Sequence, residues 1–244
     1  MKQRFALVTG SSRGIGRAIA LKFASKGYHV FLNCRHSLER LAGVQEEILA
    51  DGRGSCTMVP GDVGNPEDVR QIFCTVRTLC PALDLLVNNA GVSHTGLLID
   101  MSDEEWHTLL ASNLSSVFYC SRAALKDMVS AKSGHIINIS SMWGTCGASC
   151  EAAYSATKSG MNGLTKALAK EYAPSQIAVN AIACGVIDTE MNYHLSPDEK
   201  KALASDVPAG RFGTSEEVAE LAWKLVCCPP YLTGQIIGID GGYI

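Results

Sequence analysis

The sequence predicts an α/β fold, a three-layer α/β/α sandwich built on a doubly wound parallel sheet. Short apolar or β-branched runs alternate with longer amphipathic runs along the whole chain, which is typical of βα units. A glycine-rich turn follows the first apolar run, at the kind of strand end where open α/β sheets bind ligands. The 244 residues are enough for one large core, so we expect a single domain over residues 1–244.

Strands and helices are expected to alternate in the order that the hydrophobic periodicity gives. The strands are expected at residues 4–9, 28–34, 55–60, 83–88, 134–140, 176–183 and 235–239. The helices are expected at residues 14–26, 38–50, 66–80, 103–130, 152–172 and 215–228. Two stretches break the alternation, residues 141–151 and 185–213. Because both follow strands, we expect them to be loops that wall a substrate site.

The first strand contains the apolar run Phe5-Ala6-Leu7-Val8, and a three-glycine turn joins it to the first helix. Gly10 permits a tight turn, Gly14 lets the backbone approach a pyrophosphate, and Gly16 allows close helix packing. Unpaired N–H groups at the start of the helix attract anionic phosphate. This order predicts a Rossmann-type dinucleotide site formed by Gly10, Ser12, Arg13, Gly14, Ile15 and Gly16.

The second strand ends at residues 30–36 without an Asp or Glu, the residue that an NAD-selective site places against the ribose hydroxyls. Arg35, together with Arg13 in the glycine turn, could instead pair with a ribose phosphate. A guanidinium offers several charge-assisted hydrogen bonds to such a group. The sequence therefore predicts NADPH as the cofactor.

Charge and composition argue against several other classes of protein. The formal net charge is −3 and the basic residues are scattered, so nucleic acid is not an expected partner. No apolar run approaches the roughly 18 residues of a membrane span, and we expect no signal peptide, because residues 1–4 run directly into a strand-like apolar segment. The ten cysteines form no Cys-x-x-Cys pair, so we expect reduced thiols, a cytoplasmic protein and no metal site.

Three motifs together make the chain resemble the short-chain dehydrogenase/reductase family: Thr-Gly-x-x-x-Gly-x-Gly at residues 9–16, Asn88-Asn89-Ala90-Gly91, and Tyr154-x-x-x-Lys158. The resemblance covers residues 4 to 244 and implies an NADP-dependent oxidoreductase. It also implies further cofactor contacts, by Asp62, Val63, Asn89, Ala90, Gly91, Gly185, Ile187 and Thr189. The family usually has Pro-Gly where this chain has Cys184-Gly185, which leaves the stiffness of that turn open.

The expected chemistry depends on a tyrosine and a lysine four residues apart, which places them on one face of a helix. The ammonium of Lys158 would draw the phenol pKa of Tyr154 down from about 10, so that Tyr154 can donate a proton. Both residues would also contact the cofactor. The resemblance implies that Ser141 hydrogen-bonds the substrate carbonyl, with Ser140 as its competitor, and that Asn113 bends its helix and holds a water that connects Lys158 to solvent.

The sequence is compatible with several ketone substrates. The overall pattern is similar to the 3-oxoacyl-acyl-carrier-protein reductases of bacterial fatty-acid synthesis, which is the first interpretation. Residues 141–151 are instead similar to reductases of an aminopentanone group on elongation factor P, where Glu151 could recognise an amine. A steroid or other small ketone, and a non-catalytic NADPH-binding regulator, are further alternatives.

The resemblance also implies a homotetramer with two-fold symmetry. Its expected contacts are the two helices at 103–130 and 152–172 and the apolar C-terminal tail.

Three residues are candidates for the wall of the substrate pocket: His94, Trp143 and Cys150.

Overall fold

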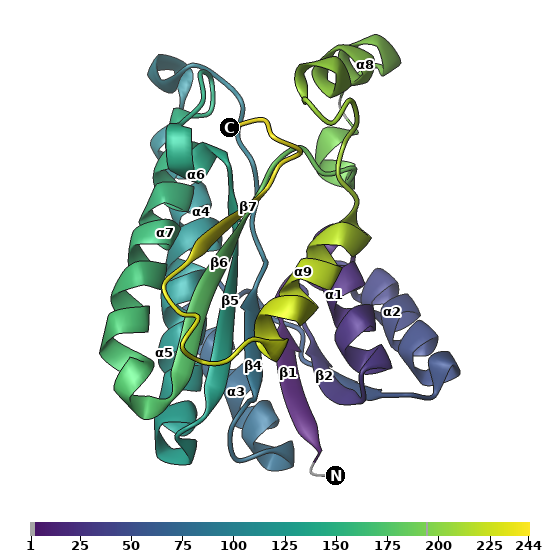
Figure 1. The fold of residues 1–244 in the computed structure, drawn as a ribbon, viewed down its shortest axis with the longest axis vertical. Helices are drawn as coiled ribbons and strands as arrows, with labels where there is room; N and C mark the ends of the chain where they lie inside the picture. Colours follow the sequence, from purple (N-terminus) through teal and green to yellow (C-terminus); the bar gives the residue numbers. More distant parts are fainter. Residues whose placement is uncertain (1–2, 194) are drawn as a thin grey trace.

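The fold is a three-layer α/β/α sandwich, seen in a computed structural model that describes residues 3–193 and 195–244 (Figure 1). Seven strands of the described chain form one parallel sheet in the order β3-β2-β1-β4-β5-β6-β7. They are β1 (Arg4–Val8), β2 (Tyr28–Leu32), β3 (Ser55–Met58), β4 (Leu85–Asn88), β5 (Gly134–Ser141), β6 (Ile177–Cys184) and β7 (Ile236–Ile239). The strand order reverses between β1 and β4, so the predicted doubly wound parallel sheet is confirmed.

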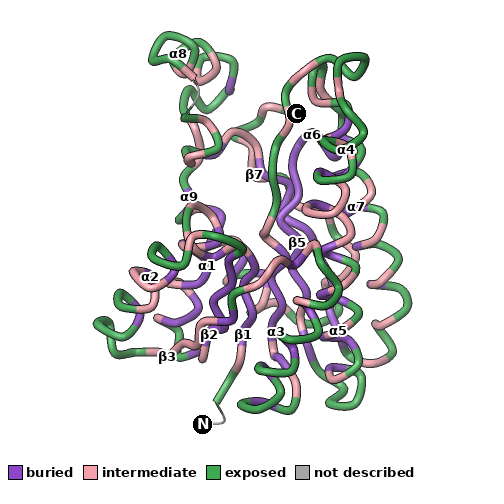
Figure 2. Tube along the Cα trace, turned by 180° about the vertical axis from the view of Figure 1, so that it is seen from behind, coloured by how far each residue is buried: buried purple, intermediate pink, exposed green. Residues whose placement is uncertain are grey.

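The central strands are apolar because both of their faces are covered. Every residue of β4 and of β6 is buried. Along β1, Ala6 and Val8 pack into one hydrophobic core, whereas Leu7 packs into the other. This alternation follows from the two-residue period of a strand. Figure 2 shows the central strands largely in the colour of buried residues, whereas the edge strands β3 and β7 are mostly of intermediate burial.

Helices form the two outer layers (Figure 1). One face of the sheet is covered by α1 (Gly14–Ser25), α2 (Leu38–Asp51) and α9 (Ser215–Cys227). The other is covered by α3 (Pro66–Leu79), α5 (Ser116–Ala131) and α7 (Ala152–Tyr172). Sequence signals mark several starts: α3 begins with Pro66 after Asn65, whose side chain accepts a hydrogen bond from the Glu67 N–H.

The single helix predicted over 103–130 is wrong in one respect, because the structure divides it. Helix α4 (Asp103–Leu110) is followed by a π-helical turn at Ala111–Ser115, and only then by α5. A π turn holds one extra residue, so it shifts the side chains out of the regular α register. It lies at Asn113, where the family resemblance implied a bend.

Both stretches that were expected to be loops contain helices. Residues 141–151 include the single turn α6 (Trp143–Cys146), and residues 185–213 include a 3₁₀ turn at Glu190–Asn192 and the helix α8 (Pro197–Asp206). Ser196 and Glu199 form a reciprocal capping box at the start of α8. This helix signal was available in the sequence. Residue 194, within the second stretch, lies outside the described residues.

Candidate active site

Two adjoining cavities open at the carboxyl ends of the strands, the edge where the sequence predicted a ligand. The first, of about 590 Å³, is walled by the glycine turn and the segments after β2, β3 and β4. The second, of about 360 Å³, contains Ser141, Tyr154 and Lys158. Asn89, Gly91 and Thr189 line both, so one ligand can extend from the first cavity into the second.

The structure brings all of the predicted cofactor residues to these walls. Thirteen line the first cavity: Gly10, Ser12, Arg13, Gly14, Ile15, Gly16, Arg35, Asp62, Val63, Asn89, Ala90, Gly91 and Thr189. The other four line the second: Tyr154, Lys158, Gly185 and Ile187. The first cavity is also lined by Asn33, His36 and Ser37, which sequence reasoning missed. Their position at the end of β2, next to Arg35, was the available signal.

The glycine turn is built for close approach. Gly10 has a φ of +63° and Gly14 a φ of +52°, a region that favours glycine. A Cβ on Gly16 would lie 2.3 Å from the Gly10 carbonyl oxygen, so helix and turn can pack this closely only without a side chain. From the other side, Thr9 Oγ1 accepts hydrogen bonds from the Asn89 and Ala90 N–H groups at 2.9 and 3.0 Å. The loop after β4 therefore braces the turn.

The start of α1 fits a phosphate group. Its N-cap residue, Arg13, makes no side-chain capping bond, and its first turn contains no acidic residue. The N–H groups and the positive end of the helix dipole are therefore available to an anion. With the bare glycines beside it, this cradle fits the pyrophosphate of a dinucleotide.

The two residues expected at the adenosine end form an ion pair with each other. Arg35 Nε lies 3.2 Å from Asp62 Oδ2, and the Arg35 side chain is 52% exposed. Asp62 is itself fixed, because its Oδ1 accepts a hydrogen bond from the Gly64 N–H at 2.8 Å. The guanidinium is therefore held at the cavity wall while its remaining N–H groups stay available to a phosphate.

In the second cavity, the tyrosine and the serine predicted to act on the substrate are hydrogen-bonded partners. The side chains of Tyr154 and Ser141 are joined by a hydrogen bond. Ser140 is held elsewhere, since its Oγ donates to Asn162 Oδ1 at 2.7 Å. The geometry thus favours Ser141 over Ser140 as the hydroxyl that shares a substrate oxygen with Tyr154.

Lys158 lies in the wall of the same cavity but is 5% exposed. Its Nζ donates a hydrogen bond to the Ile139 carbonyl oxygen at 2.8 Å and lies 5.6 Å from the centre of the Tyr154 ring. Burial lowers the pKa of Lys158 to about 8, against a smaller opposing effect of Cys184. The ammonium is therefore close to losing its proton at mildly alkaline pH.

The expected lowering of the Tyr154 pKa is wrong as a net effect in the chain by itself, where that pKa is raised. Burial raises the pKa of Tyr154, and the hydrogen bond with Ser141 opposes that rise only in part. Nearby Cys184 and Glu151 raise it further. The phenol is therefore kept protonated, the state that a proton donor needs.

Asn113 is fully buried and connects two segments of the site. Its Oδ1 accepts a hydrogen bond from the Val92 N–H at 2.8 Å, and its Nδ2 donates to the Val92 carbonyl oxygen at 2.9 Å. The same Nδ2 donates to Thr157 Oγ1 at 3.2 Å, next to Lys158 on α7. Asn113 thereby ties the loop after β4 to the helix that carries Tyr154 and Lys158.

The turn at Cys184-Gly185, where the family usually has Pro-Gly, is held by hydrogen bonds from both sides. The Cys184 carbonyl accepts from the Met142 N–H at 2.9 Å, and the Gly185 N–H donates to the Ile239 carbonyl at 3.0 Å. A Cβ on Gly185 would lie 2.6 Å from Asp240 Cα, so glycine is required there. Burial raises the pKa of the Cys184 thiol to about 12, so it is a neutral group beside Lys158.

The substrate end of the second cavity is bounded by Trp143, Glu151, Met191 and Leu203. Trp143 was an expected wall residue, and the cavity lining includes it. The expectation for His94 and Cys150 is wrong, because neither is among the lining residues. The nearby chain passes the cavity at Ser93 and Thr95 instead, and Cys150 is exposed.

The described residues contain no group of three His, Cys, Asp or Glu side chains placed to hold a metal ion. None of their helices combines the length and the apolar character needed to cross a membrane.

Comparison with known proteins gives consistent matches. The family model described as short chain dehydrogenase matches residues 4–200. The 3-oxoacyl-[acyl-carrier-protein] reductase FabG of Staphylococcus aureus (strain Mu50) is 41% identical over 238 residues, 97% of this chain and 96% of that protein. The protein of the same name from Escherichia coli (strain K12) is 38% identical over 240 residues, 98% of this chain and 96% of that protein.

A solved structure agrees with this fold over its whole length. The crystal structure of YwfH, an NADPH-dependent reductase involved in bacilysin biosynthesis, superposes with a TM-score of 0.93 at 27% sequence identity. The match covers 100% of this chain and 99% of that one.

Proposed function

Because this chain belongs to the short-chain dehydrogenase family, and is thus an NAD(P)-dependent oxidoreductase acting on CH–OH and C=O groups, we propose that it reduces 3-oxoacyl groups on acyl carrier protein to 3-hydroxyacyl groups. One observation carries the proposal: Tyr154, Ser141 and Lys158 lie together in a cavity continuous with a dinucleotide cradle. Nearly full-length similarity to two 3-oxoacyl-[acyl-carrier-protein] reductases supports this substrate.

The proposed cofactor is NADPH, which supplies the hydride when bound. Arg35 and Arg13 stand at the wall of the first cavity, where they would pair with a ribose phosphate. The glycine turn and the start of α1 would hold the pyrophosphate. Ile187, Thr189 and Gly185 would line the nicotinamide end, and Lys158 the ribose beside it.

The protein's part in the chemistry is to bind the ketone and supply a proton. Ser141 Oγ and Tyr154 Oη would converge on the carbonyl oxygen, which fixes the position of the carbonyl carbon. Tyr154 then delivers its proton to that oxygen as negative charge develops on it. The Lys158 ammonium stabilises the resulting phenolate, and its lowered pKa suits it to pass a proton on. Asn113 acts by positioning α7 against the cofactor loop.

A second candidate substrate is the 5-aminopentanone group on modified elongation factor P. The observation that favours it is Glu151, whose carboxylate lines the substrate cavity close enough to Tyr154 to raise its pKa. A carboxylate there would attract a cationic amine and disfavour an anionic substrate. A small free ketone fits the same chemistry, and the intact tyrosine, lysine and serine speak against a regulator without activity.

We also propose that residues 1–244 act as one domain in a cytoplasmic homotetramer. The single sheet that extends from β3 at one edge to β7 at the other supports one domain. Ten free thiols support a reducing compartment. The exposed side chains of Phe118 and Val129 on α5 offer apolar surface for a neighbouring subunit.

The deciding experiment compares two carriers. NADPH oxidation is measured with acetoacetyl-acyl carrier protein and with elongation factor P bearing the ketone on its lysine, and mass spectrometry detects a gain of two hydrogens. Turnover of the thioester alone supports the first substrate, and reduction of the modified factor alone supports the second. No oxidation above that of the Tyr154→Phe variant, with these substrates and a broad ketone panel, would refute a reductase.

A further inference from the structure

A second ionic cluster lies at the cofactor cavity, and two of its three members, Glu190 and Arg40, have no role in the site described above. Glu190 lies between two arginines from different parts of the chain. Its carboxylate accepts from Arg40 Nη1 at 2.8 and 2.6 Å and from Arg13 Nη1 at 3.1 Å. Arg40 is not among the residues that the sequence assigned to the site.

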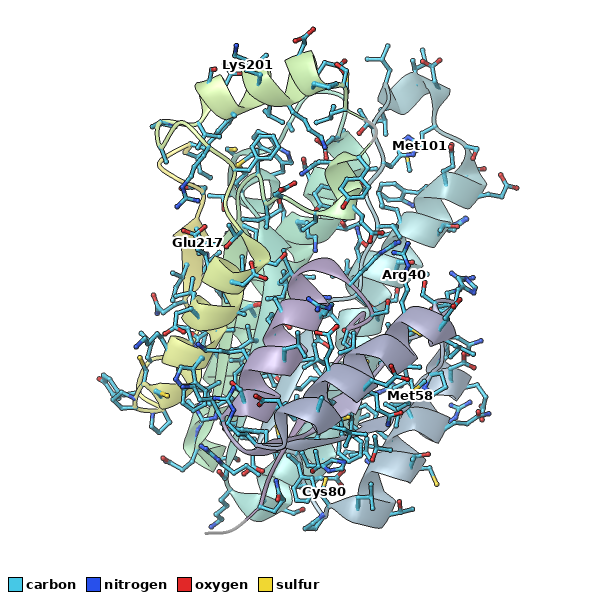
Figure 3. All side chains as sticks on the ribbon, turned by 90° about the vertical axis from the view of Figure 1, so that its right-hand side faces the viewer. Arg40, Met58, Cys80, Met101, Lys201 and Glu217 are labelled. Atoms are coloured by element: carbon cyan, nitrogen blue, oxygen red, sulfur yellow. The ribbon has the colours of Figure 1, made fainter. Side chains whose placement is uncertain are left out.

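The three residues come from three separate segments of the chain. Glu190 opens the 3₁₀ turn that leads toward α8, Arg13 belongs to the glycine turn, and Arg40 is the third residue of α2. Figure 3 shows Arg40 at the upper end of α2, with α8, marked by Lys201, above it. Arg13 and Glu190 both line the cavity. The ion pairs therefore connect the segment after β6 to the glycine turn and to α2.

The bridged segment also forms part of the cavity wall. Thr189 lines both cavities, and its Cγ2 lies 3.5 Å from the point where a Cβ on Gly14 would stand. On its other side the segment is anchored, because the Asp188 N–H donates to the Gly213 carbonyl at 2.8 Å and Asn192 Nδ2 donates to the Ile187 carbonyl at 2.8 Å. The hydrogen bonds between Glu190 and Arg40 connect the same segment to α2.

We propose that Arg40 and Glu190 form a latch that holds the segment after β6 over the bound cofactor and thereby limits the rate at which the cofactor leaves. Both are positioning residues, since they act on the cofactor only through the segment after β6, which forms part of the cavity wall. The proposal rests on the proposed nicotinamide cofactor but not on the identity of the ketone.

The two arginines differ in how closely they contact Glu190. Arg40 contacts both carboxylate oxygens of Glu190, whereas Arg13 makes one longer contact. Arg13 can therefore pair with a ribose phosphate while Arg40 remains hydrogen-bonded to Glu190. Arg40 also lowers the pKa of Glu190, so the carboxylate stays ionised through the neutral range.

A different role for Arg40 makes a different prediction. If Arg40 were a ligand of the ribose phosphate, its removal would weaken the binding of NADPH and leave NADH unaffected. Loss of Glu190 would then free Arg40 and strengthen NADPH binding. A latch, in contrast, acts on both cofactors in the same direction and depends equally on both partners.

The test is the dissociation rate of NADPH and of NADH, followed by stopped-flow fluorescence as an excess of oxidised cofactor displaces the bound one. The variants are Arg40→Ala, Glu190→Gln and the double variant. The matched controls are Asp51→Asn and Arg53→Ala, which break an exposed ion pair at the opposite end of α2. Circular dichroism and thermal unfolding establish that each variant is folded.

A latch predicts that each single variant releases both cofactors about two- to fivefold faster, the range expected for an exposed ion pair. The double variant should release them no faster than Glu190→Gln, because both changes break one interaction. High salt should reduce the difference from the wild type. The controls should leave both rates unchanged.

Unchanged release in Arg40→Ala and Glu190→Gln would overturn the latch while leaving the proposed function intact. A change confined to NADPH, with tighter binding in Glu190→Gln, would overturn it in favour of a phosphate ligand. Failure of the wild type to bind either cofactor would overturn the latch and the proposed function together.

Discussion

The ammonium of Lys158 donates a hydrogen bond to the carbonyl oxygen of Ile139 over 2.8 Å, which ties helix α7 to strand β5 beside Tyr154. A backbone carbonyl is a weak partner for a buried charge, so the ammonium is only partly compensated. The result is a lysine with a lowered pKa next to a tyrosine with a raised one. Four predictions follow from this site and its surroundings.

Removing the phenol hydroxyl should abolish most turnover while leaving the cofactor site in place. Tyr154→Phe is expected to lower kcat for ketone reduction by roughly 10²- to 10⁴-fold, the usual contribution of a positioned general acid. The Kd for NADPH, measured by fluorescence titration, should change little. Tyr172→Phe, at the far end of the same helix, is the matched control. Turnover within tenfold of wild type in Tyr154→Phe would assign the proton donor to another group.

The buried lysine should make the stability of the cofactor-free protein depend on pH. Its pKa is about 8 in the folded chain and 10.5 when exposed, so between these values the unfolded chain binds more protons. Stability should therefore rise as pH increases from about 8 to 10.5, by up to about 3 kcal/mol. Urea unfolding of Lys158→Met should lack this part of the rise. Lys166→Met, an exposed change on the same helix, should retain it.

Arg35 should decide between the two nicotinamide cofactors. Arg35→Ala is expected to weaken NADPH binding roughly 10- to 100-fold, since a hydrogen bond to a charged group contributes about 1.5–3 kcal/mol. NADH lacks the ribose phosphate, so its Kd should change by less than about twofold. Arg70→Ala, an exposed arginine paired with Glu67 on α3, is the control. Equal losses for the two cofactors would contradict the assignment of Arg35 to the phosphate.

The C-terminal tail should influence ketone binding through the pocket wall. The Tyr243 ring meets the Trp143 indole edge-on, with centroids 5.8 Å apart and an interplanar angle of 85°. Aromatic pairs of this kind contribute about 0.5–1.5 kcal/mol, so Tyr243→Ala is expected to raise the KM for the ketone about two- to tenfold. The Kd for NADPH should stay unchanged. Tyr231→Ala, at a tyrosine that is 98% exposed, should alter neither quantity.

Much of the local structure could be predicted from the chain. Helix α8 was not predicted, although Ser196-Pro197-Asp198-Glu199 is a helix start, because none of its residues is buried and it lacks a clear apolar face. The break at Ala111–Ser115 could not be found from periodicity, since one extra residue in a turn barely disturbs an amphipathic pattern.

Charge pairing in the site was beyond the reach of sequence reasoning. Arg40 and Glu190 are 150 positions apart, and the ion pair between Arg35 and Asp62 joins two strand ends. The sequence identified Arg35 and Asp62 as separate cofactor contacts and gave no signal for Arg40. The pKa of Tyr154 is raised, whereas the sequence predicted that it would be lowered, because burial outweighs a cation that lies 5.6 Å from its ring.

By itself, the sequence determined the parallel sheet, the glycine turn and the residue types of the site, because strand period, turn chemistry and motif spacing are local properties of the chain. Only the tertiary structure decided which serine meets Tyr154, how deeply Lys158 is buried, and which carboxylate each arginine holds. These properties depend on desolvation and on distances between residues far apart in the chain. The partners, the burial and the ion pairs are therefore established only when the strand ends and their loops pack together.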